Sequence, residues 1–267
     1  MEILATPARF SSRKQTIARH FASACDYDQH AHIQQQACQS LLANIAYDKQ
    51  DSVLEIGAGT GQMTRLLAAY IQSKYWLINE LCTEQTATLQ SILPDAQIVI
   101  GDAETLDFKG KHSLIVSANA VQWFNNPLSL VMQSAPRLKA GGQLLFSTFT
   151  ANNFLQIKTL TNQGLYYPET SEWQLALTHA GFERIVLSTQ RFDLLFTTPY
   201  AVLKHMKLTG VSTNQTQSVN AQPFKWTKAR LQQFERDYWQ HFSATDEEGQ
   251  PCVSLTYEVL IVSAFRN

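Results

Sequence analysis

The stretch Ser52–Ala68, SVLEIGAGTGQMTRLLA, decides the fold that the rest of the sequence completes. The apolar run SVLEI predicts a buried strand, and QMTRLLA has its apolar residues at helical spacing. Between them lie Gly57, Gly59 and Gly61, and glycine permits a tight turn and a close approach of a ligand to the backbone. A tight turn that holds no ligand has the same pattern, so the loop alone leaves both interpretations open.

Strands and helices alternate from this loop to about Phe149. KYWLINE, AQIVI, HSLIVSA and QLLFSTF predict four more strands, the last of them after a turn at Gly141 and Gly142. Thr83 can cap the helix that follows KYWLINE, and Pro94 lies just past the end of that helix. Such alternation indicates an α/β fold, a parallel sheet doubly wound with helices on both faces.

The segments on either side of this region are mostly helical in pattern. Lys14 to Ala46 lacks Gly and Pro and repeats apolar residues at helical spacing. TSEWQLALTHAGF predicts a helix with Thr170 or Ser171 at its start and Gly181 past its end. PYAVLKHMKL and TKARLQQFERDYWQHF predict two more helices, RIVLSTQRFDLLF a strand or hairpin, and SLTYEVLIVSAF a long strand.

We therefore expect an N-terminal helical lid over residues 1–50, a ligand-binding core over 51–150, and completion of the sheet, with inserted helices, over 151–267. The net charge of −1 argues against a nucleic-acid or membrane binder, and no run of apolar residues is long enough to span a membrane. His30 and His32 do not face each other on a helix, so no metal site is expected. The scattered cysteines, without CxxC pairs, indicate reduced thiols in a cytoplasmic protein; they are Cys25, Cys38, Cys82 and Cys252.

Acidic residues stand in or after three of the predicted strands. Glu80 ends the second strand, where a carboxylate can accept hydrogen bonds from ribose hydroxyls, although a surface acid is the alternative. Asp102 follows the third strand, where it can reach the exocyclic amine of an adenine or simply cap a turn. Glu55 lies inside the first strand, and its burial is costly unless a cationic ligand group or another partner pairs with it.

VLEIGAGTGQMTRLLA, INE and GDAETLDF together resemble the first three motifs of class I S-adenosylmethionine-dependent methyltransferases, over roughly Ser52 to Phe149. The resemblance implies a Rossmann-like seven-stranded sheet, with S-adenosyl-L-methionine held by the glycine loop, Glu80 and Asp102. A cationic ligand without phosphate suits an acid-lined loop better than a pyrophosphate does. The expected cofactor-binding residues are Tyr27, Glu55, Gly57, Ala58, Gly59, Gly61, Glu80, Leu81, Asp102, Ala103, Asn119 and Gln122.

A narrower resemblance joins KQTIARHFASACDYDQHAHIQQQACQSLL and SANAVQWFNNPLSLVMQSAPRLKAGGQLLFSTF to the malonyl-acyl-carrier-protein O-methyltransferases of biotin synthesis, and HMKLTGVSTN matches more loosely. It implies an enzyme that esterifies the free carboxylate of malonyl-acyl carrier protein, or of malonyl-CoA. By this resemblance Tyr27 belongs to a lid over the cofactor; an exposed phenol on a helix is the alternative.

The reaction that these resemblances imply needs no general base, because a carboxylate is ionised near neutral pH. It needs a group that orients the carboxylate, and the resemblance points to Lys204, where relatives carry Arg; Arg191 or Lys207 could serve instead. We expect Trp123 to face the reaction chamber with Asn119 and Gln122, a role in the core being its alternative.

An acidic carrier protein could dock on Lys225, Lys228 and Arg230 beside Trp226, and a solvated helix face is the alternative for that run of charge. We expect a monomer. Two other functions stay open: a methyltransferase for a small carboxylate such as trans-aconitate, and a protein that binds S-adenosylmethionine without catalysis.

Overall fold

The computed structural model describes residues 11–22, 27–209 and 226–267. Its main sheet has the strand order β5-β4-β2-β6-β7-β10-β8, with β9 pairing β10, and a second sheet pairs β1 with β3. The strands are β1 (Lys49–Gln50), β2 (Val53–Ile56), β3 (Gln72–Ser73), β4 (Trp76–Glu80), β5 (Gln97–Ile100), β6 (His112–Ser117), β7 (Leu138–Phe149), β8 (Phe182–Phe196), β9 (Ser243–Thr245) and β10 (Pro251–Arg266).

The first five strands of that order are parallel, and β10 runs antiparallel to both β7 and β8. From β2 the chain first adds β4 and β5 on one side and then β6 and β7 on the other. Strand order therefore reverses beside β2, and ligands of such sheets bind outside the carboxyl ends of the strands at that point.

Helices cover both faces of the sheet. They are α1 (Ser12–Ala22), α2 (Tyr27–His30), α3 (His32–Ala43), α4 (Gln62–Tyr70), α5 (Thr86–Ile92), α6 (Ser129–Ser134), α7 (Leu155–Thr161), α8 (Thr170–His179), α9 (Pro199–Leu208) and α10 (Lys228–Phe242). Buried residues of α3 and α4 share one core cluster, and those of α6 and α8 share another on the opposite face. Of the described helices, none is long and apolar enough to cross a membrane.

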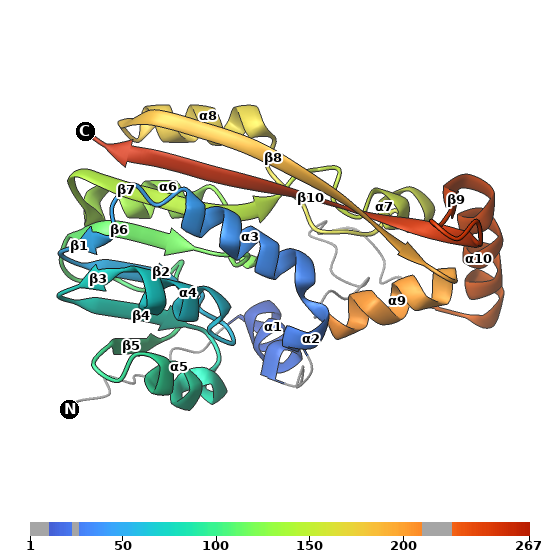
Figure 1. Cartoon of the computed structure of the whole chain (residues 1–267), viewed down its shortest axis with the longest axis horizontal. Coiled ribbons are helices and arrows are strands. Elements are labelled where there is room, and N and C mark those ends of the chain that lie inside the picture. The colour runs from blue at the N-terminus through green and yellow to red at the C-terminus, as the bar shows by residue number, and fades with distance from the viewer. Residues whose placement is uncertain (1–10, 23–26, 210–225) are drawn as a thin grey trace.

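The last two long strands, β8 and β10, form a long antiparallel ribbon. It extends past the parallel strands, and α7, α9 and α10 gather around its far end (Figure 1). Aromatic side chains fill the space between these helices and the ribbon, and Tyr257 packs edge-on against Phe154 with ring centroids 4.7 Å apart. The ribbon end and the helices α7, α9 and α10 thus lie beyond the carboxyl ends of β2 and β6 (Figure 1).

The predicted α/β fold, with its parallel strands and late helices, is confirmed. The turn predicted at Gly141 and Gly142 is wrong, because β7 runs through both residues. A Cβ on Gly142 would lie 2.9 Å from the carbonyl oxygen of Lys139, so glycine here admits close backbone at a point where the register of β6 and β7 shifts. Thr83 starts a short 3-10 turn rather than capping α5.

One expected helix start differs from the structure, and the helical pattern of the N-terminal segment is confirmed for its described residues. Glu169, rather than Thr170 or Ser171, caps α8, and it forms a capping box with Glu172. The segment from Lys14 to Ala46 holds three helices, and residues 23–26 lie outside the described part.

Candidate functional site

A cavity opens at the carboxyl ends of β2, β4, β5 and β6, beside the reversal of strand order. Together with the open space at its mouth, it contains about 980 Å³ that no protein atom occupies. We call it the outer cavity. Its lining includes most of the residues expected to bind a cofactor: Glu55, Gly57, Ala58, Gly59, Glu80, Leu81, Asp102, Ala103 and Asn119, together with Trp123.

The glycine loop forms one wall of the outer cavity. Gly57, Gly59 and Gly61 all have positive φ angles, of 71°, 55° and 83°, which favour glycine. A Cβ on Gly57 would lie 2.5 Å from the Cβ of Ala120, whereas a Cβ on Gly59 would meet open space. Gly61 lies at the N-cap of α4, packed against Ile92, and it does not line the cavity.

Glu80 ties the glycine loop to the end of β4. Its two carboxylate oxygens accept hydrogen bonds from the backbone N–H groups of Gly59, at 2.7 Å, and Cys82, at 2.8 Å. Burial raises the pKa of this carboxyl, and the two backbone donors oppose that shift. Its position at the cavity wall fits the role expected from the sequence, a hydrogen-bond acceptor for a diol.

Glu55 is the most unusual group in the lining. It is 1% exposed, and its Oε2 has no hydrogen-bond partner among the described residues. Burial raises its pKa to about 7; the nearby hydroxyl of Thr64 opposes this shift, and the neighbouring Glu80 adds to it. A buried acceptor without a partner is costly, so a cationic or hydrogen-bond-donating group in the cavity would be favourable here.

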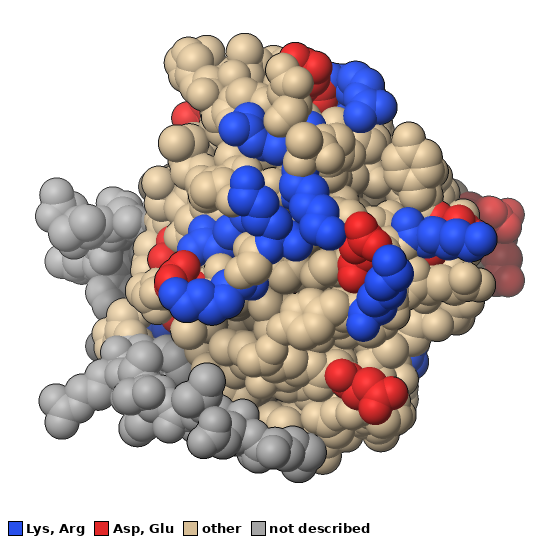
Figure 2. Space-filling model, turned by 90° about the vertical axis from the view of Figure 1, so that its left-hand side faces the viewer, with Lys and Arg blue, Asp and Glu red and all other residues tan. Residues whose placement is uncertain are grey.

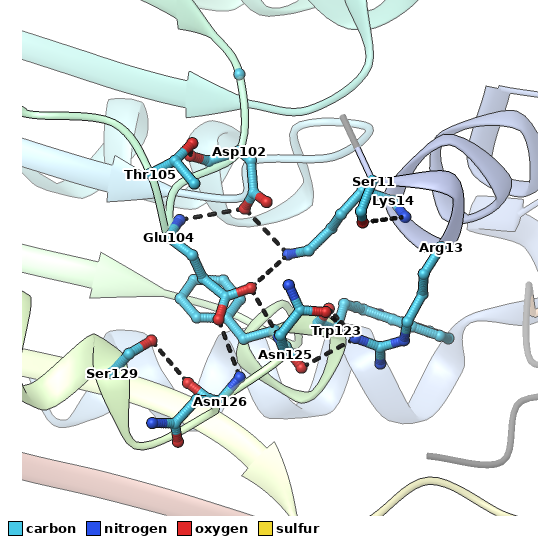
Figure 3. A network of polar contacts seen from close by, with 12 residues as sticks. Ser11, Arg13, Lys14, Asp102, Glu104, Thr105, Trp123, Asn125, Asn126 and Ser129 are labelled. Atoms are coloured by element: carbon cyan, nitrogen blue, oxygen red, sulfur yellow. Dashed lines mark hydrogen bonds and ion pairs between the residues drawn. The ribbon is translucent and has the colours of Figure 1, made fainter. Parts of the chain in front are cut away.

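Asp102 lines the outer cavity and forms an ion pair with Lys14 of α1 (Figure 3). Lys14 places its Nζ 3.0 Å from Oδ1 of Asp102 and 2.9 Å from Oε2 of Glu104, and its side chain is 4% exposed. Arg13 donates to the carbonyl oxygen of Phe124 at 3.2 Å and to Oδ1 of Asn125 at 2.9 Å. Helix α1 is therefore fastened across this end of the cavity.

Lys14 is the site residue that sequence reasoning missed. It stands in a polar, helical segment, where a lysine normally faces water, and its partners lie some 90 positions further along the chain. No local signal marks it; only tertiary structure brings its ammonium group to the cavity.

A second cavity lies behind Asn119 and Trp123, which line both. We call it the inner cavity. Its described lining residues are Gln34, Asn119, Gln122, Trp123, Phe149, Asn153, Phe154, Leu165, Tyr167, Thr209 and Tyr257. Gln122, expected at the cofactor, is thus on the inner side. Asn119 holds a positive φ of 52° and donates to the carbonyl oxygen of Gln34 at 3.1 Å, so it joins α3 to the loop after β6.

Other candidates from the sequence lie away from both cavities. Lys204 and Lys207 are exposed on α9, and neither lines a described cavity. Arg191 is exposed and pairs with Asp193. Tyr27 begins α2, but its side chain lies outside the described residues. Roles for these side chains stay predictions.

The expected docking patch is described only in part. Lys228 and Arg230 are exposed at the start of α10, and Lys225 falls outside the described residues. A denser gathering of Lys and Arg occurs at the end of the molecule that carries β1 and β3 (Figure 2), where Lys49, Lys74 and Lys139 line a groove. That groove is at the amino ends of the parallel strands, so it lies across the sheet from the outer cavity.

The described residues hold no group of three His, Cys, Asp or Glu side chains that could bind a metal ion. The strand order, the glycine loop and the acidic strand ends are those of a methyltransferase. A family model described as a methyltransferase domain matches residues 30–187, and the chain belongs to this family.

Two curated relatives carry a more specific name than the family model does. The chain is 37% identical, over 94% of its own length and 94% of the relative's, to a protein of Haemophilus influenzae named malonyl-[acyl-carrier protein] O-methyltransferase. It is also 37% identical to the protein of the same name from Haemophilus ducreyi, over 93% and 95% of the two chains. The solved N-methyltransferase NodS of Bradyrhizobium japonicum, in complex with S-adenosyl-L-homocysteine, shares the fold with a TM-score of 0.52 and 11% identity, over 96% of this chain and 99% of NodS.

Proposed function

We propose that the chain transfers a methyl group from S-adenosyl-L-methionine to the free carboxylate of a malonyl thioester on acyl carrier protein, an early step of biotin synthesis. The names of its relatives support the substrate, because the matches cover nearly the whole chain. The proposal places the cofactor in the outer cavity and only the carboxylate end of the acyl group at the inner cavity, which is much smaller, with about 340 Å³ of empty space including its opening.

The observation that carries the cofactor assignment is the set of three acids around the outer cavity. Oε2 of Glu55 accepts no hydrogen bond from the described residues and suits the ammonium group of the methionine part. Glu80 suits the ribose hydroxyls, and Asp102 keeps Oδ2 for the adenine amine, because Lys14 and the backbone of Glu104 both bond to Oδ1. The net acidity of this lining matches a cationic ligand.

The chain's own residues have a limited chemical task. When bound, the cofactor supplies a methyl group on a sulfonium, and its transfer to a carboxylate oxygen leaves a neutral ester and a neutral thioether. No residue has to remove a proton, since the carboxylate is already ionised. What the protein contributes is alignment and exclusion of water, for which Trp123 stands at the junction of the two cavities.

The carrier protein would approach near the inner cavity. Lys228 and Arg230 are exposed on α10, which packs against α9 and α7 at the end of the long ribbon. An acidic partner would be attracted to such charges mainly through its association rate. We propose this surface, rather than the groove at the opposite edge of the sheet, as the docking site.

The test is transfer of labelled methyl from S-adenosyl-L-methionine to malonyl-acyl carrier protein, with malonyl-CoA and trans-aconitate in parallel. We expect a base-labile label on the carrier-bound malonyl group. Label on trans-aconitate alone would overturn the substrate and keep the class. Tight cofactor binding without transfer to any acceptor would favour a non-catalytic protein.

A further inference from the structure

The inner cavity has a polar lining without charge. Among its described lining residues there is no Lys, Arg, Asp or Glu, and its walls combine aromatic rings with amide and hydroxyl groups. Figure 1 shows that two of the elements around it, α7 and α9, lie beyond the carboxyl ends of the parallel strands. A group held here would therefore lie next to the outer cavity, across Asn119 and Trp123.

Two side chains of this lining have hydrogen-bonding capacity that the described part of the chain leaves unused. Gln34 is 5% exposed, and its Oε1 has no partner, nor does its amide nitrogen donate to any described residue. Tyr167 is also buried; its phenolic oxygen accepts from Nδ2 of Asn153 at 3.1 Å, so its own hydrogen remains to be donated. Buried polar groups normally use their hydrogen-bonding capacity, and among the described residues no acceptor takes the Tyr167 hydrogen and no donor reaches Oε1 of Gln34.

Two basic side chains that contact the tyrosines of the inner cavity are engaged with other groups. Lys158 lies on the face of the Tyr167 ring, 4.6 Å from its centroid, and donates to the carbonyl oxygen of Ala151. His205 bonds to the hydroxyl of Tyr257, and burial lowers the pKa of this imidazole to about 4, so it is neutral near pH 7. The cavity thus offers neutral donors to an anionic guest.

We propose that the inner cavity binds the carboxylate of the acyl substrate, and that Gln34 and Tyr167 hold it through uncharged hydrogen bonds. This inference rests on the proposed function and names the residues that would select its substrate. The carboxamide of Gln34, on α3, can rotate to present its N–H to the carboxylate. The hydroxyl of Tyr167 donates from the segment before α8.

An uncharged site has a chemical advantage in this reaction. The carboxylate and the sulfonium lose their opposite charges in the transition state, so a further cation beside the carboxylate would stabilise the reactants more than the transition state. Neutral donors orient the carboxylate and leave the sulfonium as its main electrostatic partner in a site screened from water.

The experiment compares Tyr167→Phe and Gln34→Leu with two matched controls, Tyr166→Phe and Gln36→Leu, whose side chains are exposed beside them. We expect each inner-cavity variant to raise KM for malonyl-acyl carrier protein by about tenfold to a hundredfold, since hydrogen bonds to charged groups are strong. The controls should stay within about twofold of the wild type.

Two further readouts separate substrate binding from folding. Affinity for S-adenosyl-L-homocysteine should be unchanged in Tyr167→Phe and Gln34→Leu, and so should inhibition by acetyl-acyl carrier protein, which has no free carboxylate. Lys204→Met should retain its KM. A normal KM in both inner-cavity variants, or a loss confined to Lys204→Met, would overturn the inference. No transfer by the wild type would instead refute the proposed function.

Discussion

Replacing Lys14 by methionine should reveal how strongly α1 is fastened over the outer cavity. The ammonium group lies within 3.0 Å of two carboxylates that are each 10% exposed, so methionine would leave two buried negative charges facing each other. Removing one partner of a buried ion pair typically costs about 3–5 kcal/mol, because the remaining charge is uncompensated.

The remaining contacts place the expected loss at the low end of this range. Glu104 keeps the backbone N–H groups of Asn125 and Asn126, at 2.7 and 2.9 Å. Burial lowers the pKa of Arg13, and the charges of Glu104 and Asp102 oppose that shift, so this cation stays close to both acids. We therefore expect a loss of about 3 kcal/mol in the free energy of unfolding. That corresponds to a fall of roughly 6–12 °C in Tm.

Urea and thermal unfolding measure this loss, and the chain provides a matched control. Lys74 pairs with Asp51 on the surface, with side chains 83% and 56% exposed, so Lys74→Met should cost far less stability than Lys14→Met. Adding Asp102→Asn to Lys14→Met removes one of the stranded charges, keeps an acceptor for the backbone N–H of Glu104, and should restore part of the stability. Equal losses in Lys14→Met and Lys74→Met, or no rescue by the second substitution, would refute the reasoning.

Four other substitutions test the outer cavity. Gly59→Ala places a Cβ in open space, so it should weaken S-adenosyl-L-homocysteine binding in calorimetry and lower the free energy of unfolding by about 1 kcal/mol. In Gly57→Ala the new Cβ would lie 2.5 Å from Ala120, so this variant should lower Tm much further. Equal effects of the two variants on Tm would contradict this. Burial raises the pKa of Glu55 from 4.5 to about 7, so the wild type loses stability as pH rises through that interval. Glu55→Gln should not show this pH dependence, so its free energy of unfolding in urea should rise by about 3 kcal/mol relative to that of the wild type across this pH interval. Parallel pH profiles of the two proteins would speak against a buried carboxylate. Glu80→Gln leaves one of two backbone N–H groups unsatisfied and should cost about 1–3 kcal/mol in urea unfolding and weaken cofactor binding; wild-type values for both would disprove that role.

Local sequence patterns were sufficient to predict that Glu80 and Asp102 lie together at one edge of the sheet. A strand, a glycine turn and a helix follow one another along the chain, and Glu80 and Asp102 stand at strand ends that a parallel sheet must bring to one edge. Neither inference needs contacts between distant segments, so the sequence alone placed both acids correctly at the cavity wall.

The parts that sequence could not predict depend on long-range packing. Lys14 has no local feature that separates it from a solvated lysine, and its pairing with Asp102 exists only once α1 crosses the sheet edge. The inner cavity likewise draws Gln34 from α3, Tyr167 from the segment before α8 and Tyr257 from β10. Gly142 belongs to an irregular strand pairing that looks like a turn when read along one chain segment.

The most direct test of the proposed function is the intact mass of malonyl-acyl carrier protein after incubation with the enzyme and S-adenosyl-L-methionine, beside acetyl-acyl carrier protein as the matched acceptor without a carboxylate. The account predicts that the malonyl form gains the mass of one methyl group, that mild base removes it, and that the acetyl form is unchanged. An unchanged malonyl form, or equal methylation of both carrier proteins, would contradict it.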